Sequence, residues 1–388
     1  MTFRKSIFRI GQKFIRIVNY CIPKKANQIY LRSHYEYRDN IHAILDELLL
    51  NQEKSFVIYG DGEVFKEYAS QGVKYVAPGT LKSFEAFLRS KYVFNDGGMF
   101  LNSRPVKKQI IVNTWHGVSL KKIGYYLDGY NNNTGEPTST YVVTYSEFFS
   151  NIMSKAFGVG KENVLLTGEP RNDYFFKPVS ADPLSTIGIT KKQYKTVMIW
   201  MPTYRQNSVD ATSDGAEYEF GIPLLNSSNI ERLDDFCKNS DTLLLIKWHG
   251  LQCDENRQQS KLQNIRFLTS AEVGKAGISL NELVGQCDCL ITDYSSVYVN
   301  YLVLNKPICF AYDDIEEYKN NRGFMFEEVE SIMPGCHTDS LEGLMKFIDE
   351  YNKGIDNYDE ERIKTNKLLN KYSDGNNSKR LLKYLGVI

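Results

Sequence analysis

Short apolar runs alternate with stretches of helical periodicity along most of this chain. The runs are rich in Val, Ile, Leu and aromatic residues, lie between turn-forming residues and are typical of buried parallel strands. Apolar positions at helical spacing fill the intervals, as in successive β-α units. The predicted strands form a first series, residues 28–31, 55–59, 74–76, 92–95, 110–114, 141–144 and 164–166, and a second series, residues 196–200, 242–246, 265–268, 289–291 and 308–311.

A polar stretch between the two series predicts a domain junction. Residues 177–195 contain two prolines and a glycine, which are typical of a linker. Residues 339–388 show helical periodicity only. We therefore expect an α/β protein with two doubly wound, Rossmann-like domains, residues 26–190 and 191–388, and a ligand in the cleft between them.

The first 25 residues differ from the rest of the chain. They hold seven basic and no acidic side chains, and Pro23 ends their helical pattern. An amphipathic helix with one basic side suits an anionic bilayer surface, so residues 1–25 are predicted to be a membrane-association arm. The alternative is an ordinary amphipathic helix that packs on the body of the protein. The predicted apolar stripe consists of Phe3, Ile7, Ile10, Phe14, Ile17 and Cys21, and the basic side consists of Lys5, Arg9, Lys13 and Arg16.

Composition and charge narrow the class of protein. The 388 residues hold 47 basic and 47 acidic side chains, and outside the arm the counts are 40 and 47, which argues against a nucleic-acid binder. No apolar stretch reaches the roughly 18 residues of a spanning helix, and no secretory signal pattern opens the chain. Seven cysteines without CxxC spacing are typical of reduced thiols in the cytosol.

Two histidines follow predicted strands in the same sequence context. His116 and His249 each lie in a Trp-His-Gly tripeptide, one in each predicted domain. Side chains at the carboxyl ends of parallel strands face the ligand site, and an imidazole exchanges a proton near neutral pH. A single histidine in such a place is more often structural, but the repetition favours a functional pair. Gly117 and the glycine after His249 let the backbone approach a bound group.

Two loops after strands of the second series carry residues suited to phosphate groups. Asp293, Ser295 and Ser296 lie at a predicted helix start, where N–H groups and hydroxyls form a phosphate cradle; the alternative is that they only cap the helix. Arg205 follows another strand and is placed to hold a phosphate in bidentate fashion, unless it is a solvated surface side chain.

The loop at residues 168–173 is another candidate, although N-capping by Asn172 or Asp173 explains part of its composition. Several chemistries are excluded because the chain has no GxxxxGK[ST] loop, no HExxH or clustered metal ligands and no GxSxG elbow. Two histidines with phosphate-binding Ser and Arg residues instead fit metal-independent transfer from a nucleotide-diphosphate donor.

These motifs, in this order, resemble one family: the CDP-glycerol glycerophosphotransferases, which are primases and polymerases of teichoic acid and related capsular polymers of the cell wall. The resemblance runs from about residue 28 to residue 383. It rests on residues 37–40 (YRDN), 115–124 (WHGVSLKKIG), 168–173 (GEPRND), 202–205 (PTYR), 292–297 (TDYSSV), 306–307 (KP) and 312–324.

The resemblance implies a GT-B fold, here preceded by the amphipathic helix, with an acceptor-binding N-terminal domain and a donor-binding C-terminal domain. It implies a transferase that moves glycerol phosphate, or another polyol phosphate such as ribitol phosphate, from a CDP-alcohol to a lipid-linked saccharide or growing polymer and releases CMP. No metal or other cofactor is implied. The enzyme would be a peripheral protein at the cytoplasmic face of the cell membrane, and a homo-oligomer remains compatible with this.

Carried over residue by residue, the resemblance makes His116 the general base that deprotonates the acceptor hydroxyl. His249 would act on the donor pyrophosphate and the departing CMP. The donor side would comprise Thr203, Arg205, Lys247, Asp293, Ser295 and Ser296, and the acceptor side or its loops would comprise Gly117, Lys121, Glu169, Arg171 and Asp173.

Two positions depart from the family pattern. Gly250 replaces the usual proline after the second histidine, and Glu169 replaces an uncharged residue, which leaves the role of His249 and the acceptor specificity open. A GT-B glycosyltransferase that uses a nucleotide sugar is the alternative enzyme. A non-catalytic, membrane-associated binding protein is the remaining alternative.

Overall fold

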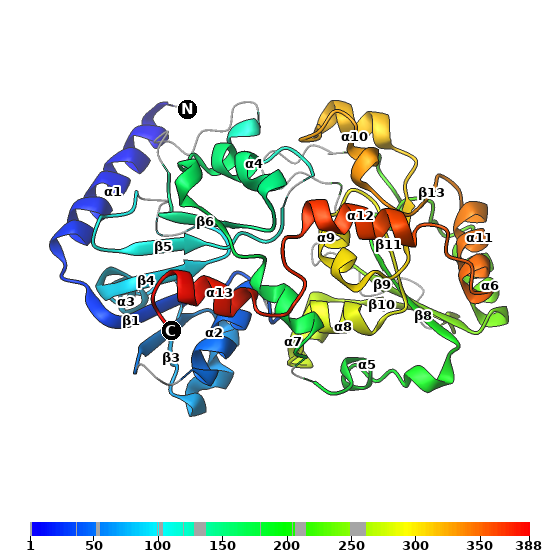
Figure 1. Cartoon of the computed structure of the whole chain (residues 1–388), viewed down its shortest axis with the longest axis horizontal. Coiled ribbons are helices and arrows are strands. Elements are labelled where there is room, and N and C mark those ends of the chain that lie inside the picture. Colours follow the sequence, from blue (N-terminus) through cyan, green and yellow to red (C-terminus); the bar gives the residue numbers. More distant parts are fainter. Residues whose placement is uncertain are drawn as a thin grey trace. The chain divides into compact units, whose positions relative to one another are not determined.

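The computed structural model describes residues 2–35, 37–51, 55–98, 100, 104–118, 120–127, 137–178, 180–203, 205, 215–248 and 261–388, with side chains from residue 10 onward. The chain forms two compact units (Figure 1). The first contains residues 1–118, 123–177 and 371–388, and the second contains residues 119–122 and 178–370. His249 and Gly250, for which the sequence predicts a role at the donor, lie outside the described residues.

The first unit is built on a seven-stranded sheet in which all neighbouring strands are parallel. The strand order is β3-β2-β1-β4-β5-β6-β7, so the chain begins in the middle of the sheet, winds to one edge and returns to build the other. The strands are β1 (Lys25–Arg32), β2 (Val57–Asp61), β3 (Lys74–Val76), β4 (Ser90–Asn95), β5 (Ile110–Asn113), β6 (Tyr141–Thr144) and β7 (Val164–Leu166).

Successive residues of a strand face opposite sides of this sheet, and each side has its own apolar cluster. Ile29 and Leu31 pack with helices α2 and α13 on one side, whereas Tyr30 packs with α3 and the end of α1 on the other (Figure 1). The helices are α1 (Thr2–Cys21), α2 (Asn40–Leu50), α3 (Leu81–Arg89), α4 (Glu147–Phe157) and α13 (Asn377–Tyr384), with 3-10 turns that include η1 (Glu63–Gln71) and η5 (Pro170–Phe175).

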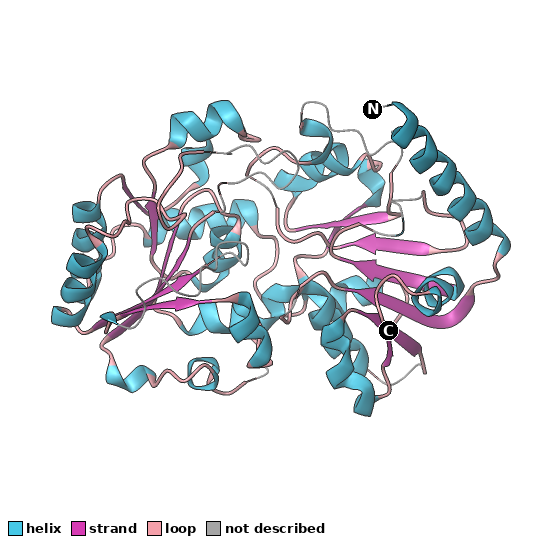
Figure 2. Cartoon of the chain, turned by 180° about the vertical axis from the view of Figure 1, so that it is seen from behind, coloured by secondary structure: helices cyan, strands magenta, loops and turns pink. Residues whose placement is uncertain are grey.

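The second unit contains a six-stranded parallel sheet with the order β10-β9-β8-β11-β12-β13. Figure 2 shows each sheet in magenta with helices on both of its faces. The strands are β8 (Thr196–Met201), β9 (Thr242–Lys247), β10 (Ile265–Leu268), β11 (Cys289–Thr292), β12 (Ile308–Ala311) and β13 (Cys336–Thr338). The helices are α5 (Pro183–Thr186), α6 (Ile230–Asn239), α7 (Ser270–Lys275), α8 (Leu280–Gln286), α9 (Val297–Tyr301), α10 (Ile315–Asn321), α11 (Leu341–Asn352) and α12 (Asp359–Leu369).

The strand orders indicate where a ligand would bind in each unit. In a doubly wound sheet the ligand lies beyond the carboxyl ends of the two strands at which the winding direction reverses. This switch point lies between β1 and β4 in the first unit and between β8 and β11 in the second. The loops after these four strands are therefore the ones expected to carry ligand-binding or catalytic side chains.

The observed units differ from the predicted domain limits at two places. The first unit ends at Lys177 rather than near residue 190, and residues 371–388 return to it although the sequence pattern places them with the second domain. The physical reason is burial: Leu381, Leu382 and Val387 of this last segment are fully buried in the apolar cluster that contains α2.

Helix α1 packs on the first unit through a face that is partly polar. Gln12 and Asn19 are buried, and the Asn19 side chain donates to the Gln109 side chain at 2.8 Å. Ile10, Phe14 and Ile17, which belong to the predicted apolar stripe, are instead 63–67% exposed. No helix in the part of the chain that the structure describes is long and apolar enough to cross a membrane.

Candidate active site

His116 lies in a strained turn directly after β5. Trp115 has a φ of 55° and Gly117 a φ of 123°, on either side of the histidine. The left-handed region costs a non-glycine residue roughly 1–2 kcal/mol, and a φ of 123° suits only glycine. The Asn113 side chain supports the turn because it accepts the Trp115 N–H at 2.8 Å. As a result the His116 side chain is exposed, stacked on the Trp115 ring at a centroid distance of 3.9 Å.

The hydrogen bond of His116 to the main chain defines its tautomer. Nδ1 lies 3.3 Å from the carbonyl oxygen of Asp96, the residue that follows β4. A carbonyl oxygen only accepts hydrogen bonds, so Nδ1 carries the hydrogen in this arrangement. Nε2 of the neutral ring is then the nitrogen that can accept a proton, as a general base requires.

The carbonyl groups of the same turn are held by two side chains. Arg171 donates from its guanidinium to the His116 carbonyl at 3.1 Å, and Asn40 donates to the Trp115 carbonyl at 3.1 Å. The two holding residues are joined, because the Arg171 N–H donates to the Asn40 side chain at 2.9 Å. This carbonyl clamp, Asn40 and Arg171, fixes the backbone on both sides of the general-base candidate.

Arg171 and Glu169, which the resemblance places toward the acceptor, lie in the support of this turn. The Arg171 guanidinium lies 3.1 Å from both the Asp39 and the Glu169 carboxylates, and Glu169 is buried. Burial alone would lower the pKa of Arg171, but the adjacent Glu169 and Asp39 carboxylates raise it, so the guanidinium stays charged. Burial also raises the pKa of Asp39, against the opposing effect of Arg171.

Asp173 caps a helix that lies far away in the sequence. Its two carboxylate oxygens accept the N–H groups of Asn377 and Ser378 at 2.8 Å each, which are among the first residues of α13. A carboxylate in this place satisfies N–H groups that the helix leaves unpaired. The predicted capping role is therefore present, although the capped helix is the last one of the chain.

Sequence reasoning missed His34 and Asp96, which meet at the switch point of the first unit. His34 Nδ1 lies 2.5 Å from the Asp96 carboxylate, which also accepts the His34 N–H at 3.1 Å and the Ser33 hydroxyl at 3.1 Å. The sequence did indicate that each residue lies near a ligand site, because both follow strands within two positions. The sequence did not indicate that the two residues contact each other, because they lie 62 positions apart in the chain.

Arg205 of the second unit is buried in a network of acidic and aromatic side chains. It donates two bonds of 3.0 Å to the Asp314 carboxylate and is paired with Asp293. Three tyrosine rings, including Tyr294 at 5.4 Å, surround the guanidinium, which is a favourable place for a cation. These contacts connect the loops after β8, β11 and β12, so Arg205 stabilises the arrangement of these loops. A bidentate grip on a phosphate by Arg205 stays a prediction.

Thr203 and Asp293 follow β8 and β11, the two strands at the switch point of the second unit, and their role at the donor stays a prediction. The Asp293 carboxylate accepts the Thr203 N–H at 2.9 Å and the Thr203 hydroxyl at 2.5 Å. Asp293 is fully buried, so it shapes the loop after β8 rather than facing a ligand.

The remaining donor candidates differ in exposure. Ser295 and Ser296 are half-buried and precede α9, whose five residues give only a weak helix dipole. Their hydroxyls and N–H groups are thus the stronger part of the predicted cradle. Lys247 is buried and donates to the Trp248 carbonyl at 2.8 Å and to the Ser270 hydroxyl at 3.0 Å.

Lys121 belongs to the second unit, although the residues on both sides of its short segment belong to the first. It forms an antiparallel bridge with Phe324, next to a bond from the Met325 N–H to the Leu120 carbonyl at 2.7 Å. This pairing anchors the predicted acceptor residue in the backbone of the second unit.

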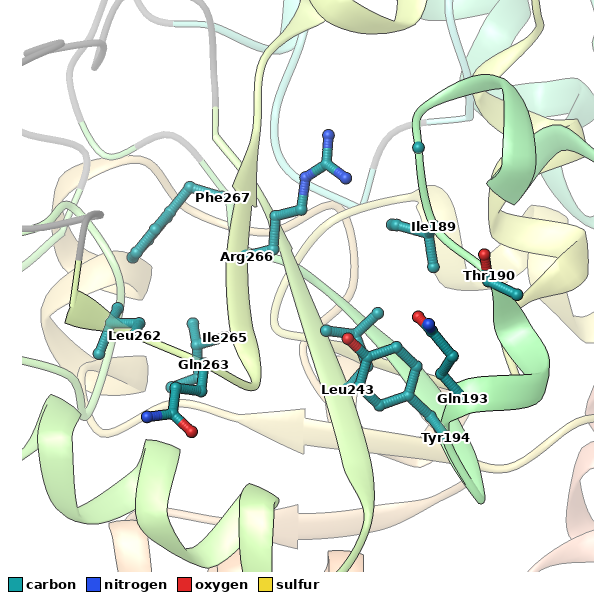
Figure 3. Close-up of a pocket in the computed structure, with 11 residues that line it drawn as sticks. Ile189, Thr190, Gln193, Tyr194, Leu243, Leu262, Gln263, Ile265, Arg266 and Phe267 are labelled. Carbon is teal, nitrogen blue, oxygen red and sulfur yellow. The ribbon is translucent and has the colours of Figure 1, made fainter.

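A cavity of about 220 Å³ lies around the edge strand β10 in the second unit. Figure 3 shows Arg266 of β10 between Phe267 on one side and Ile189 and Thr190 on the other. Ligand pockets usually exceed about 300 Å³, and none of the predicted donor residues is among those that line this cavity. Within the described residues no group of three or more His, Cys, Asp or Glu side chains is arranged to hold a metal ion.

The fold defines the class of protein: a GT-B-type chain with two parallel sheets in two units. The sequence profile described as CDP-glycerol:poly(glycerophosphate) glycerophosphotransferase matches residues 14–386, and the chain belongs to this family. The teichoic acid ribitol-phosphate polymerase TarK of Staphylococcus aureus is 29% identical over 89% of this chain, which spans 65% of the length of TarK. The teichoic acid glycerol-phosphate primase of Bacillus subtilis is 26% identical over 79% of this chain and 76% of its own length.

Solved structures confirm the fold. The wall teichoic acid polymerase TagF superposes with a TM-score of 0.75 at 19% identity, over 99% of this chain and 96% of the TagF chain. A UDP-GlcNAc 2-epimerase from Neisseria meningitidis gives a TM-score of 0.53 at 12% identity, over 92% of this chain and 99% of its own. The predicted GT-B architecture with two parallel sheets is therefore confirmed.

Proposed function

We propose that this chain transfers a polyol phosphate from a CDP-alcohol to a hydroxyl of a lipid-linked saccharide or growing polymer and releases CMP. The family match over residues 14–386 supports the reaction class. The observation that carries the proposal for this chain is the held, exposed His116, whose Nδ1 is bonded to the Asp96 carbonyl. Relatives are named for glycerol phosphate and for ribitol phosphate, so both are candidate groups.

The chemistry follows from the tautomer of His116. Nε2 accepts the proton of the acceptor hydroxyl while the hydroxyl oxygen attacks the phosphorus that carries the polyol. A new P–O bond forms, the bond from that phosphorus to the bridging oxygen breaks, and CMP leaves with that oxygen. Positioning and charge stabilisation supply most of the rate in phosphoryl transfer.

The second unit is the proposed donor side. Ser295 and Ser296, half-buried in the loop after β11, would bind the pyrophosphate through hydroxyl and N–H groups, and His249 would act beside them. The network of Arg205, Asp293 and Asp314 supports this loop, which gives those residues a positioning role at the donor site.

The membrane is the proposed partner of α1. Ile10, Phe14 and Ile17, here called the α1 stripe, are exposed although three apolar side chains on one helix face would normally be buried. Residues 1–25 hold seven basic and no acidic side chains, which complements an anionic bilayer. The packing through Gln12 and Asn19 supports a helix that is fixed to the body and still presents this stripe. The enzyme would then be peripheral to the cytoplasmic face of the membrane.

Product analysis with several donors tests the reaction. The purified protein is offered CDP-glycerol, CDP-ribitol or a UDP-sugar together with a lipid-linked disaccharide, and nucleotide release and the new bond are measured. We expect CMP and a phosphodiester from a CDP-alcohol. A nucleoside diphosphate together with a glycosidic bond would identify a glycosyltransferase instead, and no turnover with any donor would favour a binding protein.

A further inference from the structure

The pair formed by His34 and Asp96 is not used by the mechanism above, and it lies at the switch point of the first unit. His34 follows β1 and Asp96 follows β4, which are the two strands at which the winding direction reverses. His116 follows β5, the next strand of the sheet. All three residues therefore lie at the carboxyl ends of the strands, where open α/β sheets hold their ligands.

The structure holds the His34 ring in one place. The Asp96 carboxylate accepts both the N–H and Nδ1 of His34, at 3.1 Å and 2.5 Å. Gly97 gives the ring its space, because a Cβ at that position would lie 3.0 Å from Cε1 and from Nδ1 of the imidazole. The side chain is nevertheless 42% exposed, and Nε2 has no hydrogen-bond partner among the residues that the structure describes.

Charge indicates what the exposed edge of His34 can bind. Asp96 is fully buried, and His34 is the one cation-forming side chain within ion-pair distance of it in the described part of the chain. A buried carboxylate is costly unless a cation compensates it, so the pair is balanced when the ring is an imidazolium. Such a ring donates Nδ1–H to Asp96 and directs its second N–H outward, toward an oxyanion.

His34 is also linked to the general-base candidate. The next residue, Tyr35, contacts the His116 ring edge-on at 6.3 Å, and the Asp96 carbonyl accepts from His116 Nδ1. A group bound at His34 would thus lie in the same loop cluster as the hydroxyl that His116 deprotonates. The family description names poly(glycerophosphate), in which a phosphate follows each hydroxyl-bearing unit, and the acceptor of this chain would carry such phosphates.

We propose that His34, held by Asp96 and Gly97, binds a phosphate of the acceptor next to the hydroxyl that reacts at His116. The proposal rests on the proposed function, because it takes the acceptor site to be in the first unit. It assigns His34 to acceptor specificity and leaves the proton transfer to His116.

The experiment uses the full chain and a probe without nucleotide, a synthetic trimer of glycerol phosphate, with binding measured by calorimetry. His34→Gln keeps a polar side chain of similar reach but removes the charge, and Gly97→Ala keeps the imidazole but displaces it. We expect the Kd of the trimer to rise about 10-fold in both variants, the effect of one lost charge-assisted hydrogen bond. The double variant His34→Gln/Asp96→Asn removes the unbalanced buried carboxylate and is expected to recover thermal stability without recovering trimer binding.

Kinetics with three acceptors identify the phosphate. The acceptors are an alkyl disaccharide without phosphate, a lipid-pyrophosphate disaccharide, and the same lipid extended by glycerol phosphate units. A KM increase in His34→Gln for the extended lipid alone assigns the polymer phosphodiester, and an increase for both lipids assigns the pyrophosphate.

Two results would overturn the proposal: unchanged trimer binding in both variants, or a loss of kcat that is equal for all three acceptors. If the wild type releases no CMP with any acceptor, the proposed function fails, while trimer binding still decides the role of His34.

Discussion

At the scale of single residues, the site depends on side chains that hold main-chain atoms. The His116 turn contains Trp115 in the left-handed region and Gly117 at a φ that only glycine adopts readily. This strained turn therefore needs support from other parts of the chain. Arg171 and Asn40 supply that support through the carbonyls of His116 and Trp115. Asp96 supports the site in the reverse way, since its main-chain carbonyl accepts from the His116 side chain and thereby determines which nitrogen of the ring is basic.

Replacing Arg171 by lysine tests the carbonyl clamp. Lysine keeps the positive charge between Asp39 and Glu169 but cannot also reach the His116 carbonyl, because it lacks the planar fork of arginine. We expect kcat to fall about 10-fold while the KM values of donor and acceptor stay within roughly threefold, as for a loss in the transition state alone. Arg362→Lys is the matched control, since Arg362 is a buried arginine paired with Asp356 in the second unit. A raised acceptor KM with unchanged kcat would instead show that Arg171 binds the acceptor and does not hold the catalytic turn.

His42, which lies next to Asp39, makes the stability of the same region depend on pH. It is the third residue of α2, where its Nδ1 accepts the Asp39 N–H at 3.3 Å. Burial, followed by the nearby Arg38 charge, lowers the pKa of His42 to about 3. The unfolded chain, with a histidine pKa near 6.5, therefore binds a proton that the folded protein does not bind between about pH 6.5 and pH 3, and stability is lost as the pH falls through this window.

His42→Gln removes this titration and keeps a side chain that can accept the Asp39 N–H. Between pH 7.5 and pH 5, the free energy of unfolding of the wild type should fall by about 2 kcal/mol relative to the variant. Denaturant unfolding of both proteins at the two pH values measures the difference. An equal pH dependence of the two proteins would contradict the buried, neutral state of His42.

Sequence reasoning located the candidate residues better than it assigned their partners. His116 was predicted from its place after a strand, and the structure puts it in an exposed turn. Arg205 was predicted from the same rule, but its partners Asp293 and Asp314 lie 88 and 109 residues away and enclose it. Which side chains meet at a switch point depends on the strand order, and that order has no local sequence signal.

At the scale of secondary-structure elements, α1 shows how one pattern is compatible with two packings. The helical wheel predicts the apolar stripe, and burial of such a stripe on the body was the natural alternative. The structure instead packs the face opposite Ile10, Phe14 and Ile17, through the buried bond from Asn19 to Gln109, and Val18 and Ile22 add apolar contacts. Removing residues 1–25 would break these contacts, so point substitutions on the exposed side are the sharper test.

Replacing Ile10, Phe14 and Ile17 by serine tests membrane binding by the α1 stripe. Each apolar side chain contributes up to about 1.5–3 kcal/mol when it is buried, so sedimentation with anionic vesicles should fall at least 10-fold. Turnover of a soluble acceptor should be unchanged. The matched control is Ile363→Ser/Leu368→Ser, which removes exposed apolar side chains from α12. Vesicle binding that survives the triple substitution would contradict this role of α1.

The strands were the most predictable elements, and the exceptions have a physical reason. All seven strands of the first sheet were predicted, and β3, β6 and β7 have the predicted limits. Strand β13 was missed because Cys336, His337 and Thr338 form a short edge strand that is half-exposed and has no apolar run. Burial on both faces produces the apolar run that sequence reasoning detects, and an edge strand of three residues lacks it.

At the scale of the whole molecule, the two units are not consecutive pieces of the chain. Residues 120–122 pair with residues 323–325 of the second unit, and residues 371–388 complete the core of the first. The hydrophobic pattern predicts two sheets correctly but cannot show these exchanges, because the exchanged segments are short or helical. The net charge of zero is likewise a sum of unlike parts, a basic arm and an acidic body.

We propose that His116 of this chain deprotonates the acceptor hydroxyl in a transfer that releases CMP. The most direct measurement is CMP release from CDP-glycerol and CDP-ribitol by the wild type and by His116→Ala, with thermal unfolding as the control. We expect a kcat lower by about 10² to 10⁴ at a Tm that changes little, because the side chain is exposed on the surface and its loss removes the base. CMP release by the variant at the rate of the wild type would show that His116 is not the general base.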